Sequence, residues 1–269
     1  MKCLLIGFGN IGKIHSKYLD KKNIAWDWTD KNLGSSVQNI NYNDYTHIFI
    51  LTPEKTHYEV YKQIKRSGYQ GFLFVEKPAV VNSRDFDIFE DKNVFVGLVE
   101  RYNPAIQTLQ KFCNPSKIIN IDFSRCCVAD HSSSASLLED LGIHDLDLFL
   151  QITKLDKLNL LNVESYKNGK TCILTIEDPV LARFIWSKDT YFKERKITVR
   201  QDDCTFEVDL QEQTVVKHYY HQGKIVSESL FVEKSSPIAN EQDSFFLNEN
   251  QNGLMQSHKL LVKVNEANL

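Results

Sequence analysis

Hydrophobic and polar positions follow two different patterns along the chain, and the pattern changes near residue 115. Before that point, short continuous apolar runs alternate with segments of helical spacing. Such runs are typical of strands that are buried on both faces of a parallel sheet. The predicted strands are Met1–Ile6, Ile24–Thr29, Ile48–Leu51, Phe72–Val75 and Val94–Leu98, and the predicted helices are Lys13–Leu19, Thr56–Ser67 and Ser83–Phe89. The alternation predicts a doubly wound α/β domain over residues 1–115.

After residue 116, several predicted strands alternate apolar with polar residues, which indicates an antiparallel sheet with one face in water. These strands are Ile118–Cys126, Leu158–Tyr166, Thr171–Ile176, Ala182–Trp186, Lys196–Arg200, Thr205–Leu210, Thr214–Tyr220 and Lys224–Phe231. Helices are expected near Leu137–Ile152 and Gln242–Val264. We therefore expect an α+β domain over residues 116–269 with a predominantly antiparallel sheet, for substrate binding and oligomerisation. Its C-terminal helix is able to pack back on the first domain, and a cleft is expected between the two domains.

Composition narrows the class of protein. The chain has 269 residues, of which 42% are hydrophobic and 25% charged, as in a globular protein with a real core. A net charge of −3, with basic residues spread along the chain, argues against binding to nucleic acid or to a membrane surface. The six cysteines form no C-x-x-C pair and no zinc spacing, so we expect reduced thiols, no metal and a cytoplasmic location.

The first predicted strand runs directly into a glycine-rich turn and then into a helix. The turn reads Gly7-Phe8-Gly9-Asn10-Ile11-Gly12, which is the G-x-G-x-x-G fingerprint of a dinucleotide-binding Rossmann domain. Asp30 closes the next strand about 20 residues later, where an acidic side chain binds the adenosine ribose. We expect NAD to bind here and NADP to remain possible, because Lys31 and Asn32 could receive a 2′-phosphate. The competing interpretation is an ordinary βα turn without a ligand.

Two further strand ends carry candidate chemistry in the first half. Glu76-Lys77-Pro78 follows an apolar strand at its carboxyl end, where ligands bind in open α/β sheets. Pro78 restricts Lys77 to an extended conformation, and its ammonium group could stabilise a developing alkoxide. A solvated lysine is the alternative. Thr52-Pro53 ends another strand and His57 opens the next helix, either to line the cofactor pocket or only to start that helix.

The helix expected at Leu137–Ile152 carries Asp140, His144 and Asp147 at positions i, i+4 and i+7. That spacing places two carboxylates beside an imidazole and supplies a candidate general base. Gly142 costs about 1 kcal/mol in a helix interior, which a substrate or cofactor pressed against the helix would explain. The alternative is a solvated charged face. Arg101 and Tyr102 follow the last strand of the first half, where Arg101 either reaches the cleft or anchors the linker.

In this order the motifs GFGNIGKIH, TPEKTH, VEKP and DLGIHDLD resemble the Gfo/Idh/MocA family of NAD(P)-dependent oxidoreductases. The resemblance spans both halves and implies hydride transfer between nicotinamide and a secondary alcohol or ketone of a polyol, sugar or nucleotide sugar. It implies that Lys77 and His144 form a proton relay and that Asp140 binds substrate. Arg101, Tyr102 and Asp147 are further candidates for the substrate site. The predicted cofactor site contains the three glycines and Asp30 together with Phe8, Asn10, Ile11, Thr52, Pro53, His57, Glu76 and Lys77.

Two other functions stay open at this point. One is a catalytically silent regulator that senses a dinucleotide or a sugar, and the other is a reductase of a non-sugar carbonyl or a tetrapyrrole. We also expect a homo-oligomer, because strands from Lys196 to Phe231 offer candidates for an outward apolar face: Val199, Val215, Tyr219 and Val226. The alternative is that helices or the segment Ser235–Gln251 cover that face.

Overall fold

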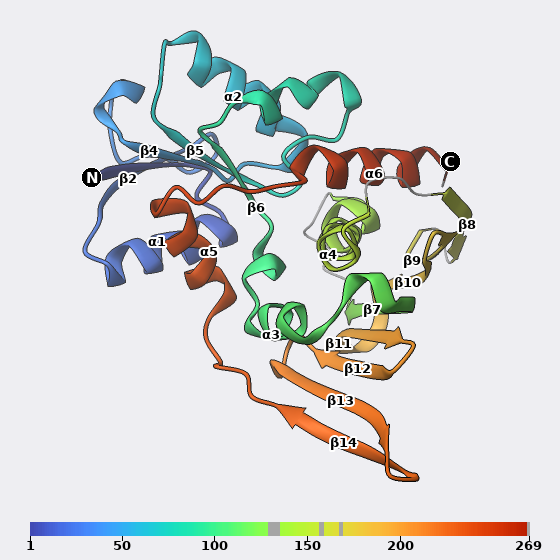
Figure 1. Cartoon of the computed structure of the whole chain (residues 1–269). Helices are drawn as coiled ribbons and strands as arrows, with labels where there is room; N and C mark the ends of the chain where they lie inside the picture. Colours follow the sequence, from blue (N-terminus) through green and yellow to red (C-terminus); the bar gives the residue numbers. More distant parts are fainter. Residues whose placement is uncertain (129–134, 156–158, 167–168, 268–269) are drawn as a thin grey trace. The chain divides into compact units, whose positions relative to one another are not determined.

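The computed structural model describes residues 1–128, 135–155, 159–166 and 169–267, in two compact units (Figure 1). Unit 1 contains Met1–Gly97 and Asp243–His258, and unit 2 contains Leu98–Gln242 and Lys259–Leu269. The chain therefore leaves unit 1 at the end of strand β6, before the expected boundary at residue 115. The reason is that α3 (Pro104–Phe112), which follows, packs against strands β12 and β13 of unit 2.

Unit 1 is built on a six-stranded sheet in the order β3-β2-β1-β4-β5-β6. Its strands are β1 Lys2–Ile6, β2 Ala25–Asp30, β3 Gly34–Ser35, β4 His47–Ile50, β5 Phe72–Glu76 and β6 Val94–Gly97. All neighbours are parallel except β2 and β3. Because β1 lies between β2 and β4, the strand order reverses there, and ligands bind doubly wound sheets at the carboxyl ends of strands at this position. The expected doubly wound fold is confirmed.

The helices of unit 1, and the two C-terminal helices that lie partly in it, differ from the expected ones in two places. The α-helices are α1 Asn10–Lys21 and α2 His57–Arg66, and the 3₁₀ helices are η1 Tyr42–Asp44, η2 Glu54–Thr56 and η3 Ser83–Glu90. The expected helix Ser83–Phe89 is thus a 3₁₀ helix. The single helix expected at Gln242–Val264 is two helices, α5 Pro237–Phe246 and α6 Leu254–Ala267. They are separated where Asn248 and Gly253 adopt positive φ angles, which end a helix.

The returning segment Asp243–His258 completes the core of unit 1. The Phe245 ring lies between 5.2 and 5.4 Å from the rings of Phe49, Phe74 and Phe95, which come from three strands of the sheet. The side-chain amide of Gln251 accepts from the Val96 N–H at 2.7 Å and donates to its carbonyl at 2.8 Å. Strand β6 is an edge strand, so Gln251 satisfies backbone groups that the sheet leaves open.

Unit 2 is built on an eight-stranded sheet in the order β14-β13-β12-β11-β7-β10-β9-β8, in which only β7 and β10 are parallel. Its strands are β7 Ile118–Val128, β8 Asn159–Tyr166, β9 Thr171–Asp178, β10 Leu181–Ser187, β11 Asp189–Gln201, β12 Cys204–Asp209, β13 Thr214–His221 and β14 Lys224–Leu230. The expected α+β fold with a mainly antiparallel sheet is confirmed. Residue 158 of the strand expected at Leu158–Tyr166 lies outside the described residues.

Short helices complete unit 2. They are η4 Val99–Tyr102, α3, η5 Pro115–Lys117, the π-helical turn η6 Leu138–Gly142 and α4 Ile143–Thr153. Helix α4 packs on the sheet through Phe149, whose ring lies 5.6 Å from Phe184 and 6.5 Å from Phe123. Every residue of α4 except Gln151 is buried. Because α4 is almost completely buried, its charged side chains need partners inside the protein.

The outward face of the second sheet is more polar than expected. Val199 and Val215 are buried, so their assignment to an outward apolar face is wrong, whereas Tyr219 and Val226 are half-buried. On the water-facing side the Arg200 guanidinium donates to Asp122 at 2.6 Å. Over the described part of the chain, no helix is long and apolar enough to cross a membrane.

Candidate active site

The three glycines of the turn in unit 1, Gly7, Gly9 and Gly12, each have a different structural role. Gly7 has φ +99°, and a Cβ there would lie 2.5 Å from the Leu51 carbonyl oxygen. A Cβ on Gly12 would lie 2.5 Å from the Gly7 carbonyl oxygen, which fixes the close approach of α1 to the turn. A Cβ on Gly9 would meet nothing within 4 Å. Gly7 and Gly12 are therefore required by the fold, whereas Gly9 keeps open the space in front of the turn.

The N-terminus of α1 faces this open space without a side-chain cap. Gly9 is the N-cap residue, no side chain bonds to it, and the first turn carries no acidic residue. The first N–H groups of a helix have no acceptor within the helix, and the helix dipole favours an anion there. The donor set of this turn therefore fits a pyrophosphate.

Asp30 is tied directly to the glycine turn. Its carboxylate accepts hydrogen bonds from the backbone N–H of Phe8 at 2.8 Å, of Asn32 at 2.8 Å and of Leu33 at 3.1 Å. These backbone donors, Phe8 first, lower the pKa of Asp30 below its usual value. The Phe8 ring stacks on Trp28 at 4.7 Å, so the residues on both sides of the turn are held in place.

The end of β5 and the residue after it bring Glu76 together with Lys77 and His15. The Lys77 N–H donates to Glu76 Oε2 at 3.0 Å, and His15 Nε2 lies 3.2 Å from Glu76 Oε1. Burial would raise the pKa of Glu76, but the His15 bond and the Lys77 charge act in the opposite direction, and its pKa is lowered overall. The Lys77–Pro78 peptide bond is cis.

His57 connects the two predicted cofactor loops. It is buried, with Nδ1 2.8 Å from the Pro78 carbonyl and Nε2 2.6 Å from the Thr52 carbonyl. Thr52 in turn accepts a hydrogen bond from the Thr56 hydroxyl at 2.9 Å. Both ring nitrogens of His57 thus face backbone carbonyls, and the single N–H of the neutral ring donates to one of them.

In unit 2, Asp140, His144 and Asp147 lie on a helix that begins as the π-helical turn η6 and continues as α4. A Cβ on Gly142 would lie 3.2 Å from Leu138 Cδ2 and 3.7 Å from Trp186 Cε2. Gly142 therefore packs close to Leu138 and Trp186, and a ligand pressed against the helix at this position stays a prediction. A π-helical turn of this kind occurs frequently at functional sites.

Each of the two predicted carboxylates on this helix has a basic partner. Asp140 forms an ion pair with Lys188, in which Oδ2 lies 2.7 Å from Nζ, and the Asp140 side chain remains 30% exposed. Asp147 is buried and receives two bonds from Arg101, one from Nε at 2.7 Å and one from Nη2. Arg101 thus anchors η4 to α4. His144 lies between these positions in the sequence and is 8% exposed.

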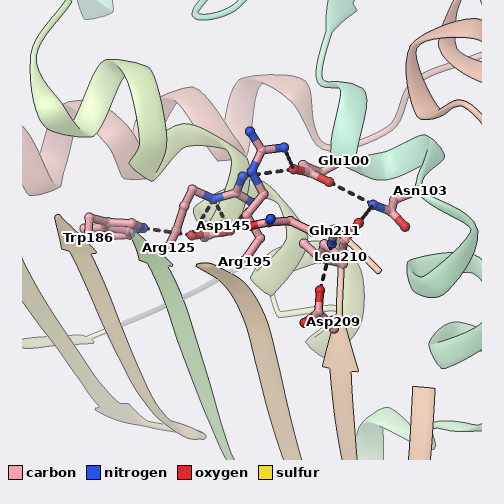
Figure 2. Close-up of polar contacts among 9 residues, drawn as sticks. All are labelled: Glu100, Asn103, Arg125, Asp145, Trp186, Arg195, Asp209, Leu210 and Gln211. Atoms are coloured by element: carbon pink, nitrogen blue, oxygen red, sulfur yellow. Dashed lines mark hydrogen bonds and ion pairs between the residues drawn. The ribbon is translucent and has the colours of Figure 1, made fainter. Parts of the chain in front are cut away.

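A buried ionic network joins α4 to the sheet of unit 2 (Figure 2). Arg125 on β7 donates to both oxygens of Asp145, the residue next to His144, and to Glu100 Oε1 at 2.9 Å. Trp186 Nε1 also donates to Asp145, and Arg195 Nη1 donates to Glu100, at 2.9 and 3.0 Å. Arg125, Asp145 and Glu100 are each at most 3% exposed.

The charges in this network compensate one another. Burial alone would raise the pKa of Glu100, but the positive charges of Arg125 and Arg195 lower it overall. Asn103 extends the network, because its amide donates to Glu100 Oε2 at 3.2 Å and to the Leu210 carbonyl at 2.9 Å (Figure 2). The network connects η4, β7, β10, β11 and α4, and so fixes the helix that carries His144.

Sequence reasoning missed the residues of this network and the partners of the predicted residues. They are Glu100, Asn103, Arg125, Asp145, Trp186, Lys188 and Arg195. One signal was available, since Asp145 belongs to the quoted motif DLGIHDLD and lies directly after His144. Among the described residues, no group of three or more His, Cys, Asp or Glu side chains could hold a metal ion.

Comparison with known proteins finds similar sequences and structures. No family model matches the chain. The sequence is 24% identical over 190 residues to UDP-N-acetylglucosamine 3-dehydrogenase of Acidithiobacillus ferrooxidans, covering 65% of this chain and 58% of that protein. The aligned region is thus less than two thirds of the relative's length.

Solved structures match over almost the whole chain. The structure of the same Acidithiobacillus ferrooxidans enzyme superposes with a TM-score of 0.82 at 20% identity, covering 100% of this chain and 97% of that one. Levoglucosan dehydrogenase, solved in complex with NADH and levoglucosan, gives a TM-score of 0.80 at 10% identity and covers 99% and 95%. A dehydrogenase from Clostridium difficile gives 0.76 at 14% identity and covers 99% of each chain. The chain therefore has the fold of these proteins.

Proposed function

We propose that this protein is an NAD(P)-dependent oxidoreductase that transfers a hydride between nicotinamide and a secondary alcohol or ketone of a polyol, sugar or nucleotide sugar. The observation that carries the proposal is the glycine turn, in which Gly9 leaves space for a ligand and the N-terminus of α1 lacks a side-chain cap. Two of the similar proteins act on sugars or nucleotide sugars by name, and one was solved with NADH.

The residues of unit 1 fit a dinucleotide. The N–H groups of Asn10 and Ile11 at the start of α1 would hold the pyrophosphate, and Asp30 would hold the adenosine ribose. Asp30 still has room for this role, since hydrogen bonds to its carboxylate come from backbone groups on one side of the turn and its side chain is not buried. Thr52, Pro53 and Glu76 complete the cofactor side. When bound, the nicotinamide accepts or donates the hydride.

Lys77 and His144 carry the proton chemistry in this proposal. In the direction of oxidation, His144 takes the proton of the substrate hydroxyl as a general base, and the Lys77 ammonium stabilises the emerging alkoxide. Asp140 binds a further substrate hydroxyl. Its Lys188 partner limits its rotation and leaves the carboxylate partly exposed for that contact. Tyr102 stays a candidate for substrate contact, whereas Arg101 and Asp147 support the helix through their ion pair.

We test the relay by replacing its two members. His144→Ala or Lys77→Met should each lower kcat by at least about 100-fold while the affinity for NADH barely changes. His221→Ala, an exposed histidine at the end of β13, and Lys17→Met, an exposed lysine on α1, are the matched controls and should keep normal turnover. Near-normal kcat in either relay variant would show that the catalytic assignment is wrong.

Location and assembly complete the proposal. All six cysteines are free, and Cys3, Cys126, Cys172 and Cys204 are buried, as suits a protein of the reducing cytoplasm. A homo-oligomer remains our expectation, with the exposed side chains of Tyr220 and Ile225 on the β13–β14 hairpin as contact candidates.

A further inference from the structure

The segment Glu76–Ala79, which contains Lys77, is held by buried histidines from three different elements of unit 1. His15 on α1 contacts the Glu76 carboxylate, His57 at the start of α2 contacts the Pro78 carbonyl, and His258 on α6 contacts the Ala79 N–H. Each of these histidines is at most 1% exposed. None of the three has a part in the proton relay proposed above.

The partners of His258 determine which of its nitrogens carries the proton. The Ala79 N–H is a donor, at 3.1 Å from Nε2, so Nε2 must be an unprotonated acceptor. Nδ1 lies 2.8 Å from the Leu254 carbonyl and must therefore donate. The imidazole is neutral and uses both nitrogens, and its ring lies 4.7 Å from the ring of Phe89. The ring is thereby fixed in position and orientation.

The backbone on both sides of Lys77 is fixed in this way. Before Lys77, the Glu76 carboxylate is bound by His15 and accepts the N–H of Lys77 itself at 3.0 Å. After it, His57 Nδ1 lies 2.8 Å from the Pro78 carbonyl, and His258 accepts a hydrogen bond from the Ala79 N–H. A reactive group must be held within about 0.5 Å of its productive position by the contacts behind it.

We propose that His258, on the C-terminal helix α6, is a positioning residue for Lys77, acting through its hydrogen bond from the Ala79 N–H. The inference rests on the proposed function, in which the Lys77 ammonium stabilises the substrate alkoxide. Loss of the Nε2 acceptor leaves a buried N–H without its partner, so the segment shifts to satisfy that group elsewhere. The glycine turn and Asp30 lie at other strand ends and keep the dinucleotide bound.

Two substitutions separate the two nitrogens of His258. In His258→Gln the side-chain oxygen reaches the position of Nε2 and can accept from Ala79, whereas in His258→Asn the amide reaches only the position of Nδ1. We expect His258→Asn to lower kcat by about 10- to 100-fold with little change in NADH affinity. His258→Gln should recover most of the lost turnover. Equal kcat losses in both variants, or a loss confined to NADH affinity, would overturn the proposal.

Hydrogen exchange at the Ala79 amide supplies a readout that does not depend on turnover. We expect slow exchange in the wild type and in His258→Gln, and fast exchange in His258→Asn. Similar exchange in the two variants would overturn the proposed contact. If the wild type reduces no nicotinamide with any sugar while the three proteins show this exchange pattern, the result would contradict the proposed function and not the contact.

The control is another buried histidine of the same unit. His47 begins β4 at the opposite, amino end of the sheet, and its Nδ1 lies 2.9 Å from the Thr46 hydroxyl. His47→Asn should lower thermal stability while leaving kcat and Ala79 exchange unchanged. A similar fall of kcat in His47→Asn would mean that loss of any buried histidine slows the enzyme, which would overturn the specific role of His258.

Discussion

Among the described residues, Arg125 is the only cation that contacts both Asp145 and Glu100. Replacing it by methionine leaves these two buried carboxylates without their shared partner. The two carboxylates are 2% and 3% exposed, so they cannot regain water without opening unit 2. Trp186 and Arg195 would each still contact one of them. We therefore expect a strong loss of stability in unit 2.

The magnitude follows from the burial of the network. Removing one partner of a buried ion pair costs about 3–5 kcal/mol, because the charge left behind is uncompensated. The residual bonds from Trp186 and Arg195 place the expected cost near the lower end, at about 3 kcal/mol. With a urea m-value of about 2 kcal/mol/M, the unfolding midpoint of unit 2 should fall by about 1.5 M.

The assay is urea unfolding followed by tryptophan fluorescence. Trp186 is buried in unit 2, whereas Trp26 and Trp28 lie on β2 of unit 1, so the measurement is made in a Trp26→Phe/Trp28→Phe background. Arg200→Met is the matched control, because Arg200 forms its ion pair with Asp122 on the water-facing side of the same sheet. An exposed pair of this kind contributes about 0.2–1 kcal/mol.

Acid unfolding gives a second test of the same reasoning. The folded pKa of Glu100 is lowered, so its contribution to stability is complete above about pH 5 and is lost as the pH falls through the folded pKa. Of the two positive charges that lower this pKa, Arg125→Met removes the one with the larger effect, so acid unfolding should begin at a higher pH. Equal urea midpoints for Arg125→Met and Arg200→Met, together with unchanged acid unfolding, would refute the network as a source of stability.

Three further predictions follow from the glycine turn, the ribose site and the sheet. Gly9→Ala should fold normally but lose NADH affinity in a fluorescence titration. Gly12→Ala should lower the thermal stability of unit 1, because its Cβ would lie 2.5 Å from the Gly7 carbonyl oxygen. Equal thermal stability of the two variants would contradict this reasoning. Because of Asp30, the protein should bind NADH more tightly than NADPH in parallel titrations, and clearly tighter NADPH binding would contradict the assignment of Asp30 to the ribose. Light scattering at micromolar concentration should give a mass above the 31.2 kDa of one chain, and a sharp monomer peak would reject the oligomer.

Local patterns explain which parts of the structure the sequence predicts. The strands of unit 1 and the glycine turn are encoded by neighbouring residues, since apolar runs and the spacing of Gly7, Gly9 and Gly12 are visible in a short window. The contacts that support the site are not local. Arg125 meets Asp145 across 20 residues, and Ala79 meets His258 across 179. Only the three-dimensional fold brings such pairs together.

Other differences come from structure within a helix. The pattern at Leu137–Ile152 correctly indicates a helix, but no short-range signal shows that its first turn is a π-helix. No short-range signal shows that Gly142 packs near Trp186, which comes from a strand 44 positions later. The valines at positions 199 and 215 alternate correctly with polar residues, but alternation alone does not show which face the core covers.

The central claim is that this chain moves a hydride between nicotinamide and a sugar-like alcohol or ketone. The most direct measurement is the absorbance of reduced nicotinamide when the purified protein and NAD⁺ are mixed with polyols, sugars and nucleotide sugars in turn, with Lys77→Met as the parallel sample. The account predicts reduction of NAD⁺ with at least one of these substrates and at least about 100-fold slower reduction by the variant. NADH binding without turnover of any substrate in either direction would contradict the claim and indicate a protein that senses the dinucleotide.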